Sequence, residues 1–402
     1  MPPAASTTHN PLEFLASDLA KLEADGLVME WPTLEAPQEP RTVLDGRPVI
    51  NMAANNYLGL ANHPAVKGAA AAALERYGAG VASARNACGN LPLHGELEAR
   101  LAAFKGVEAV LVTQTGYVAN LGIFPALLGE EDAIVSDAFN HASLIDSARM
   151  SRARVHVYAH GDVGDAAVRL REARDAGARR IALVTDGIFS MDGDIAPLPG
   201  LVMAAETVGA FTYVDDAHAV GVIGTGGRGT VDHFGLEGRV AIQVGTLSKA
   251  LGIMGGYIAG SRELIGWLEQ RHRAQFFSAS TLTPADTAAA LKALDIVEAE
   301  PERIERLWAR AAYFRNGLNT LGFNTGVSET PLIPVIIGSA AKTKALRDAL
   351  MVEGVFAVAV TYPIVAEDAS RLRTIVSSEH TEADLNEALD AFGRCGRSAG
   401  IL

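Results

Sequence analysis

Short apolar segments alternate with longer alanine-rich segments along most of the chain beyond residue 47, and this alternation restricts the fold more than any other feature. The apolar segments are 109–112, 133–137, 180–186, 211–215 and 240–245. Apolar runs of strand length separated by helical segments are typical of a parallel sheet covered by helices. We therefore predict an α/β fold with a mostly parallel central sheet.

The two ends of the chain depart from this pattern. Leucines at helical spacing followed by a proline-containing stretch predict an N-terminal helix and linker segment over residues 1–50. A large domain is expected over residues 51–288. From residue 289 two long helical segments precede further apolar strands, which predicts a smaller C-terminal α+β domain over residues 289–402.

Charge and cysteine content restrict the partners and the compartment. The 402 residues contain 34 Lys and Arg against 47 Asp and Glu, a net charge of −13, which disfavours binding to nucleic acid. Cys88 and Cys395 are too few and too far apart for a disulfide framework or a cysteine-rich zinc site. The chain shows no signal-peptide pattern and no apolar run of bilayer length. We expect a cytoplasmic protein with no membrane partner and no metal.

One glycine-rich motif is a misleading match. Residues 224–229, GTGGRG, fit the G-x-G-x-x-G dinucleotide fingerprint, but no apolar helix begins at Thr230, so we interpret them as a flexible turn. The chain also lacks the G-x-x-x-x-G-K-[ST], H-E-x-x-H and G-x-S-x-G motifs. The usual parts of nucleotide hydrolases, zinc proteases and serine esterases are therefore missing.

Polar residues of types that take part in catalysis or ligand binding follow four of the predicted strands. These loops carry Gly116 and Tyr117, His141, Asp215 and His218, and Thr246 to Lys249. Because ligands of open α/β sheets bind beyond the carboxyl ends of the strands, the loops are expected to converge. A lysine, a buried carboxylate, an imidazole and a helix N-terminus together suit pyridoxal phosphate.

Each residue has a plainer interpretation when it is taken alone. A loop lysine such as Lys249 is usually a solvated charge, and a strand-end aspartate such as Asp216 usually caps a turn or a helix. His141 alone is equally well explained by a hydrogen bond in the core. Their joint occurrence, with a Thr-Leu-Ser-Lys loop following the strand-end aspartates, favours a cofactor site.

Longer motifs extend this interpretation to a family resemblance. Residues 51–64, 185–193, 214–221 and 245–252 resemble the signatures of the α-oxoamine synthases, which are fold type I pyridoxal-phosphate enzymes. The resemblance runs from about Glu35 to the end of the chain. Residues 55–57, 88–89, 185–187 and 267–271 are most similar to the branch of 2-amino-3-ketobutyrate CoA ligase, or glycine C-acetyltransferase. The resemblance implies the fold type I transferase fold.

The resemblance also implies catalytic and cofactor-binding roles. Lys249 would form the Schiff base and remove the α-proton of the amino acid, and Asp215 would pair with the ring nitrogen. His218 would bond the phenolic oxygen of the ring, with Ser190 nearby, and His141 would stack on the ring face. A carboxylate close to the ring nitrogen favours its charged form, which agrees with the role given to Asp215.

The remaining implied contacts concern the phosphate and the substrate. The phosphate would be held by Gly116, Tyr117, Thr246 and the partner's Ser278, so the resemblance implies a homodimer with a shared active site. Arg373 and Asn55 would bind the amino-acid carboxylate, for which a guanidinium is well suited.

The activity implied is an acyl transfer that condenses glycine, or another small amino acid, with a short acyl-CoA such as acetyl-CoA. The product would be an α-amino-β-keto compound and free CoA. Two alternatives stay open. One is a decarboxylating α-oxoamine synthase of the 8-amino-7-oxononanoate synthase, serine palmitoyltransferase or 5-aminolevulinate synthase type. The other is a plain aminotransferase, which would need no CoA; a non-catalytic role is disfavoured by the intact lysine and aspartate.

Overall fold

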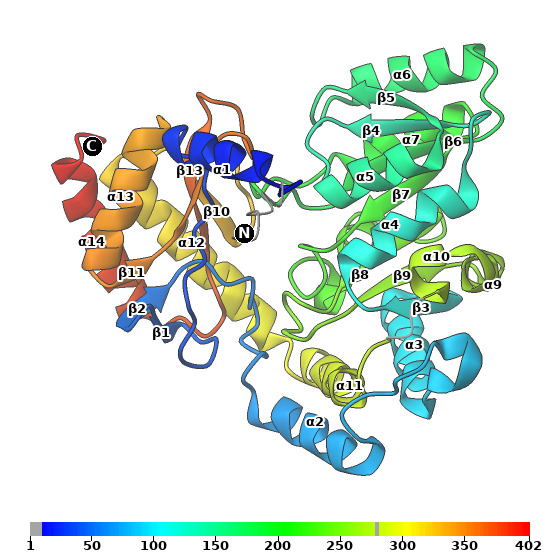
Figure 1. Ribbon diagram of the computed structural model, residues 1–402, viewed down its shortest axis with the longest axis horizontal. Helices are drawn as coiled ribbons and strands as arrows, with labels where there is room; N and C mark the ends of the chain where they lie inside the picture. The colour runs from blue at the N-terminus through cyan, green and yellow to red at the C-terminus, as the bar shows by residue number, and fades with distance from the viewer. Residues whose placement is uncertain (1–9, 278–280) are drawn as a thin grey trace, which may run out of the picture.

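The computed structural model describes residues 10–277 and 281–402. Seven strands form its largest sheet: β3 (Ala109–Thr113), β4 (Ala133–Asp137), β5 (Arg154–Tyr158), β6 (Ile181–Asp186), β7 (Phe211–Asp215), β8 (Ile242–Thr246) and β9 (Gly256–Gly260). Their order across the sheet is β3-β9-β8-β7-β6-β4-β5 (Figure 1). All run in the same direction except β9, which is antiparallel to both of its neighbours. The predicted fold, a mostly parallel central sheet covered by helices, is confirmed.

Two helical layers cover this sheet. The helices of this part are α2 (Pro64–Tyr77), α3 (Pro92–Lys105), α4 (Gly116–Leu127), α5 (Ala142–Ser151), α6 (Val163–Asp175), α7 (Leu198–Thr207), α8 (Thr230–His233), α9 (Arg262–Arg271) and α10 (Arg273–Phe276), with the short turns η1 (Arg85–Gly89) and η2 (Thr225–Gly227). Successive strand residues face opposite sides of a sheet. Accordingly, Ile134 of β4 packs in the cluster of α4 and α5, whereas Val135 packs in the cluster of α6 and α7.

The smaller sheets lie in the C-terminal part of the molecule. Their strands are β1 (Arg41–Leu44), β2 (Arg47–Asn51), β10 (Leu332–Gly338), β11 (Val355–Phe356), β12 (Val358–Val360) and β13 (Ser370–Ile375), and the accompanying helices are α12 (Glu302–Leu321), α13 (Ala340–Val352) and α14 (Glu382–Ser398). The preceding helix α11 (Pro284–Ala299) instead packs on α2 and α3 of the large part. The strand orders are β1-β2-β11 and β10-β13-β12. The smaller C-terminal sheet domain is therefore present. The domain limits at residues 51 and 289 stay a prediction, but the parallel pairing of β2 with β11 joins the N-terminal hairpin to the C-terminal part.

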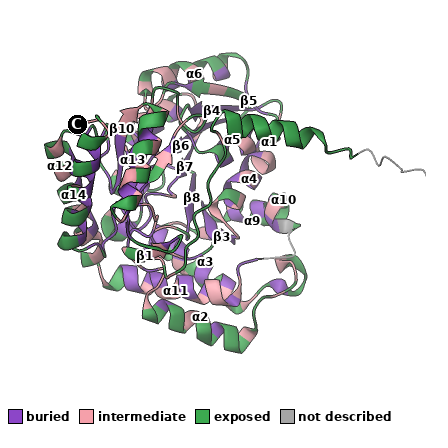
Figure 2. Cartoon of the chain, turned by 60° about the vertical axis from the view of Figure 1, so that its left-hand side comes forward, coloured by how far each residue is buried: buried purple, intermediate pink, exposed green. Residues whose placement is uncertain are grey.

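The N-terminal helix α1 (Phe14–Ala24) contains three of the leucines at helical spacing, Leu15, Leu19 and Leu22, but buries none of its residues. Figure 2 shows it exposed along its length. In the part of the chain that the structure describes, no helix is both long enough and apolar enough to cross a membrane.

The glycine run 224–229 is a turn, as predicted, and is followed only by the four-residue helix α8. It folds over the strand-end Asp216. Gly229 has φ of 102°, and a Cβ at this position would lie 2.1 Å from Oδ2 of Asp216. A glycine is therefore required for the close approach of this turn to the carboxylate.

Candidate active site

A cavity of about 230 Å³ lies where the loops that follow β3, β4, β6, β7 and β8 meet. The predicted residues in its lining are Gly116, Tyr117, His141, Ser190, Asp215, His218, Thr246 and Lys249. Strand order explains this convergence, because the carboxyl ends of parallel strands share one edge of the sheet. Residues far apart in the sequence thus surround one space, although their roles stay predictions at this point.

Lys249 is a half-buried amine at this cavity. Burial lowers its pKa from 10.5 to about 8; the charge of Asp215 opposes this shift and that of Arg373 adds to it. A positive charge is costly in a poorly hydrated site, so the neutral amine is favoured. The lysine therefore has an appreciable neutral population near physiological pH, which a nucleophile or a base requires.

Asp215 and His141 are joined by a hydrogen-bond network through Asn120. The amide of Asn120 donates to Oδ2 of Asp215 at 2.6 Å and to Oγ of Ser143 at 2.8 Å, and Tyr213 donates to the amide oxygen of Asn120. Oγ of Ser143 lies 2.7 Å from Nδ1 of His141. The network holds the carboxylate and the imidazole in fixed relative positions.

The protonation of His141 follows from the same contacts. The backbone N–H of Ser143 donates to Nδ1 of His141, so Nδ1 is an acceptor and the proton of the neutral ring is on Nε2. Partial burial lowers the pKa of His141, although Asp215 opposes this. The exposed ring therefore presents a neutral aromatic face next to Tyr117.

His218 is buried, and its Nδ1 lies 2.9 Å from the hydroxyl of Tyr57. Burial, with a further contribution from Lys249, lowers the pKa of His218 well below its usual value. Burial also raises the pKa of Tyr57 to about 12, so this hydroxyl keeps its proton. Tyr57 can donate to Nδ1, which leaves an N–H at Nε2 for a ligand oxygen.

The N-terminus of α4 forms the end of the cavity suited to an anion. The side chain of Thr115 caps the helix by accepting from the N–H of Val118. The first N–H groups, those of Gly116 and Tyr117, have no partner within the helix and lie at its positive end. A phosphate binds readily to such a terminus.

Close packing keeps this terminus in place. Thr246 lies against Gly116, where an added Cβ would be 3.2 Å from Cβ of Thr246. On the antiparallel strand β9, a Cβ at Gly256 would lie 2.4 Å from the nitrogen of Gly116. The strand and the helix start approach so closely that only glycine fits between them.

Arg373 and Asn55 are not in the lining of the cavity but lie beside it. Nη2 of Arg373 donates to Oδ1 of Asn55 at 3.2 Å, and Nε donates to the backbone oxygen of Ser190 at 2.6 Å. The charge of Arg373 helps to lower the pKa of both Lys249 and His218. Arg373 is thus close to the predicted reaction centre. The other predicted contact, Ser278, lies outside the described residues.

Sequence reasoning missed Asp186, a buried carboxylate that lines the cavity. Among the residues that the structure describes, its Oδ1 has no hydrogen-bond partner, and burial together with Asp215 raises its pKa well above the usual value. Asn120 and Tyr57 were also missed as site residues. The position of Asp186 at the end of a buried strand, like that of Asp215, was the available signal.

These features fit pyridoxal phosphate. Lys249 provides an amine for its aldehyde, and Asp215 a carboxylate for its ring nitrogen. His218 presents a donor for the phenolic oxygen, and the start of α4 provides amides for the phosphate. The unpartnered Oδ1 of Asp186 shows that the cavity has room for a polar ligand among these groups.

Comparisons with known proteins agree with this chemistry. The family model "aminotransferase class I and II" matches residues 47–392. The 8-amino-7-oxononanoate synthase of Symbiobacterium thermophilum is 51% identical over 390 residues, which cover 97% of this chain and 99% of that protein. The 8-amino-7-oxononanoate synthase of Thermoanaerobacter pseudethanolicus is 48% identical, with 99% and 100% covered. Among solved structures, a serine palmitoyltransferase with its pyridoxal phosphate has a TM-score of 0.91 and 31% identity, with 97% and 98% covered.

The predicted glycine C-acetyltransferase activity is wrong. Relatives with 46% to 51% identity over nearly the whole chain are 8-amino-7-oxononanoate synthases, one of the stated alternatives, and glycine loses its support with the activity. The motifs that favoured the acetyltransferase carry little information about the substrate. Tyr57 bonds His218, and Asn55 bonds Arg373, at the cofactor side of the site. In residues 267–271, Trp267 bonds the backbone of α4 and is not in the lining of the cavity.

Proposed function

The chain belongs to the class I and II aminotransferase family of pyridoxal-phosphate enzymes, and we propose that it acts as an 8-amino-7-oxononanoate synthase. Within this family it is an acyltransferase of the α-oxoamine synthase type. The observation that carries the proposal is the full-length similarity to synthases of this name, combined with a cavity in which the lysine, aspartate and imidazole groups are all present.

The product defines the two substrates. In 8-amino-7-oxononanoate, the terminal methyl carbon, the amino-bearing carbon and the nitrogen correspond to alanine without its carboxyl group. The other carbons form a dicarboxylic acyl chain whose one end is a ketone, so they correspond to a pimeloyl thioester. A bond forms between the α-carbon of alanine and the thioester carbonyl carbon while the C–S bond breaks and releases a thiol. The alanine carboxyl group leaves as carbon dioxide, and a proton takes its place.

Pyridoxal phosphate, when bound, supplies an electron sink for the negative charge that develops on the α-carbon. The chain supplies the acid–base groups and the orientation. In the proposal Lys249 takes the α-proton, since its pKa of about 8 leaves part of the amine neutral near physiological pH. Asp215 is held by Asn120 in position to keep the ring nitrogen charged.

Three further groups orient the ligands. His141, fixed through Ser143, would contact one face of the ring, and His218, fixed by Tyr57, would donate to the phenolic oxygen. Arg373 binds the amino-acid carboxylate, where each charge-assisted hydrogen bond contributes roughly 1.5–3 kcal/mol. Specificity for alanine then requires that its methyl group is accommodated beside the bound carboxylate.

We also propose a homodimer in which the partner's Ser278 completes the phosphate site. Sedimentation of the purified protein tests the assembly. A monomer that retains full activity would contradict the shared site.

Product analysis tests the activity. The purified protein, supplied with pyridoxal phosphate, is mixed with alanine, glycine or serine and with pimeloyl, acetyl or palmitoyl thioesters, and thiol release is followed together with product mass. We expect thiol release with alanine and the pimeloyl thioester, and labelled carbon dioxide from carboxyl-labelled alanine. Lys249→Ala provides the control and is expected to release no thiol. A product that keeps the carboxyl group, or a preference for serine with a palmitoyl thioester, would refute the proposal.

A further inference from the structure

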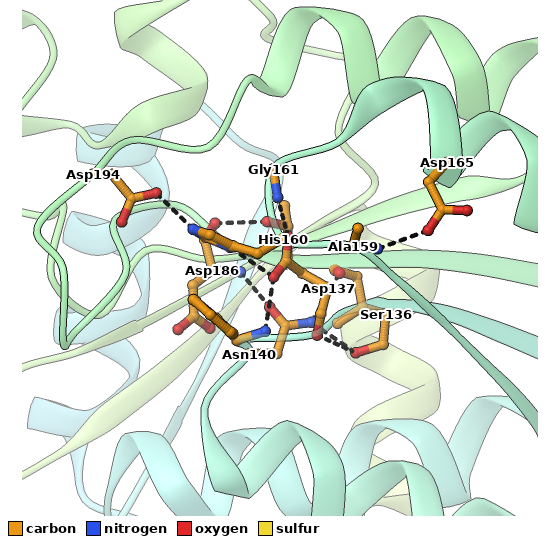
Figure 3. Close-up of polar contacts among 12 residues, drawn as sticks. Ser136, Asp137, Asn140, Ala159, His160, Gly161, Asp165, Asp186 and Asp194 are labelled. Atoms are coloured by element: carbon orange, nitrogen blue, oxygen red, sulfur yellow. Dashed lines mark hydrogen bonds and ion pairs between the residues drawn. The ribbon is translucent and has the colours of Figure 1, made fainter. Parts of the chain in front are cut away.

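His160 lies outside the cofactor cavity and contacts carboxylates through both of its ring nitrogens. It belongs to the turn between β5 and α6. Nδ1 lies 2.9 Å from Oδ1 of Asp137, and Nε2 lies 3.0 Å from Oδ2 of Asp194 (Figure 3). Asp137 is the last residue of β4 and leads into one loop, and Asp194 lies in another loop, which follows β6 at the same edge of the sheet. One imidazole therefore connects three loops.

Geometry determines the charge of this ring. A neutral imidazole has one N–H and one lone pair, so it would direct a lone pair at one of the two carboxylates. The imidazolium donates to both. Burial alone would lower the pKa of His160, but the hydrogen bonds to Asp137 and Asp194 outweigh this effect and raise the pKa to about 10.

Aromatic contacts fix the plane of the ring. Phe139 is stacked on the His160 ring with the centroids 4.3 Å apart and the planes 18° from parallel. Phe189 meets the ring edge-on, with the centroids 4.4 Å apart. Phe139 and Phe189 belong to the same two loops as the carboxylates, so each loop makes both a polar and an aromatic contact with His160.

The first loop leads to His141. Asp137 is the last residue of β4, and its carboxylate also accepts from the N–H groups of Phe139 and Gly161. Asn140 follows, and its side chain accepts from the backbone of Asp186 and donates to that of Val184 (Figure 3). The next residue is His141, the N-cap of α5. The position of Asp137 thus determines how the chain enters the cavity.

The second loop leads to Arg373. The backbone N–H of Phe189 donates to the carbonyl of Asp194 and closes the tight turn that contains Ser190. The carbonyl of Ser190 accepts from Nε of Arg373 at 2.6 Å. The neighbouring Arg371 bonds the carbonyl of Met191 and the carboxylate of Asp192 in the same turn. Asp194 therefore secures a turn that supports the arginine proposed to bind the substrate.

We infer that His160, in its charged form, is a positioning residue that fixes the loop carrying His141 relative to the turn that supports Arg373. This inference rests on the proposed function only for the roles of His141 and Arg373. His160 lies outside the cavity, but it would keep His141, which contacts the cofactor ring, aligned with Arg373, which contacts the amino-acid carboxylate.

Other titratable groups lie in the segments that meet at the imidazole. They are Asp137 at the end of β4, Tyr158 at the end of β5, Asp162 and Asp165 at the start of α6, Asp186 at the end of β6, and Asp192 and Asp194 in the following turn. Arg371 pairs with Asp192. Among these groups, Asp137 and Asp194 are the carboxylates in contact with the ring, so they determine its charge.

Substitution separates positioning from stability. His160→Gln keeps a hydrogen-bonding side chain but cannot carry the charge or bridge both carboxylates. We expect a rise of about 10- to 100-fold in the KM for the amino acid, the size that misplacement of a binding group produces, with a smaller change in kcat. The visible circular dichroism of the bound cofactor should also change, because its position relative to His141 changes. His156 lies on β5, the strand that precedes the turn of His160, and makes no contact in this cluster. His156→Gln is therefore the matched control and should behave as the wild type.

A second measurement needs no variant enzyme to be active. Nitrogen NMR of histidine-labelled protein, with the His160 signal assigned from the His160→Gln spectrum, should show both ring nitrogens protonated at pH 8.5. A neutral ring at that pH would overturn the inference. So would a His160→Gln variant that loses only thermal stability while the amino-acid KM and the cofactor dichroism stay at wild-type values. If His160→Gln does not fold, the same kinetics and the same cofactor dichroism on Asp194→Asn, which alters one of the two carboxylates in contact with the ring, decide the question.

Failure of the proposed function gives a different result. In that case the wild type makes no 8-amino-7-oxononanoate. The dichroism of the bound cofactor, and the change in it when amino acids are added, can still be measured for His160→Gln and for the wild type and compared. The inference fails where these two proteins do not differ, or where the His160 ring is neutral at pH 8.5.

Discussion

The depressed pKa of Lys249 makes a quantitative prediction about the protein without its cofactor. With a pKa of about 8 instead of 10.5, roughly 24% of the amine is neutral at pH 7.5 rather than about 0.1%. Only the neutral amine attacks an aldehyde. The structure therefore predicts that Lys249 captures pyridoxal phosphate roughly 200-fold faster at this pH than a lysine with an ordinary pKa and the same intrinsic reactivity.

The assay is the initial rate of covalent attachment between pH 6 and pH 10. Attached cofactor is trapped with borohydride and quantified on the peptide that contains Lys249. Nα-acetyl-lysine, measured in the same buffers, corrects for ionisation of the cofactor itself. After this correction the rate should rise with pH and level off above about pH 8, the pKa of the amine.

Two variants test the cause of the shift. Burial is the main cause, but Asp215 raises the pKa of Lys249 and Arg373 lowers it. Asp215→Asn should therefore move the midpoint of the profile to lower pH, and Arg373→Met should move it to higher pH. A corrected rate that keeps rising to pH 10 in the wild type would refute the reasoning, as would shifts of the opposite sign in the variants.

Three further predictions concern binding and stability. Arg373→Lys should raise the amino-acid KM sharply while the absorption of the bound cofactor stays unchanged; an unchanged KM would remove Arg373 from the carboxylate site. Lys105→Met should destabilise the protein by about 3–5 kcal/mol in chemical denaturation, because it leaves the buried Asp216 without the ammonium 3.0 Å away, and a loss below about 1 kcal/mol would show that the pair is dispensable. Lys249→Met should stabilise the cofactor-free protein by up to about 3 kcal/mol below pH 8, since the unfolded lysine binds a proton more tightly than the folded one. The gain in the free energy of unfolding should fall as pH rises from 8 to 10.5, and a gain that does not depend on pH would contradict this prediction.

Much of the central sheet could be predicted from the sequence because its strands are buried on both faces. β4 and β7 have the predicted bounds, and each is a mostly apolar run that ends at an aspartate. β5 was missed because it is an edge strand with a mostly exposed surface. β9 was missed because glycines occupy both of its ends, and these glycines are required by packing that only the folded sheet reveals.

The candidate site shows the same limit. Residues in short motifs after strands, such as Lys249 and Asp215, could be placed at the cavity because strand order brings those loops together. Asn120 could not, since its partners Asp215 and Ser143 come from other elements far along the chain. The acyl substrate was predicted wrongly because of where the motifs used to select it lie. Tyr57 contacts His218 at the cofactor side of the site, and Trp267 packs α9 on α4.

The pairing of β2 with β11 has a consequence for how the chain folds as it is made. Ile50 pairs with Val355, so β2 of the N-terminal hairpin cannot pair with β11 until nearly the whole polypeptide has left the ribosome. At bacterial and eukaryotic translation rates of about 5–20 residues per second, the delay is roughly 15 to 60 seconds. During that time the outer edge of β2 is open to pairing with other nascent chains, whereas the β3–β9 sheet can already assemble.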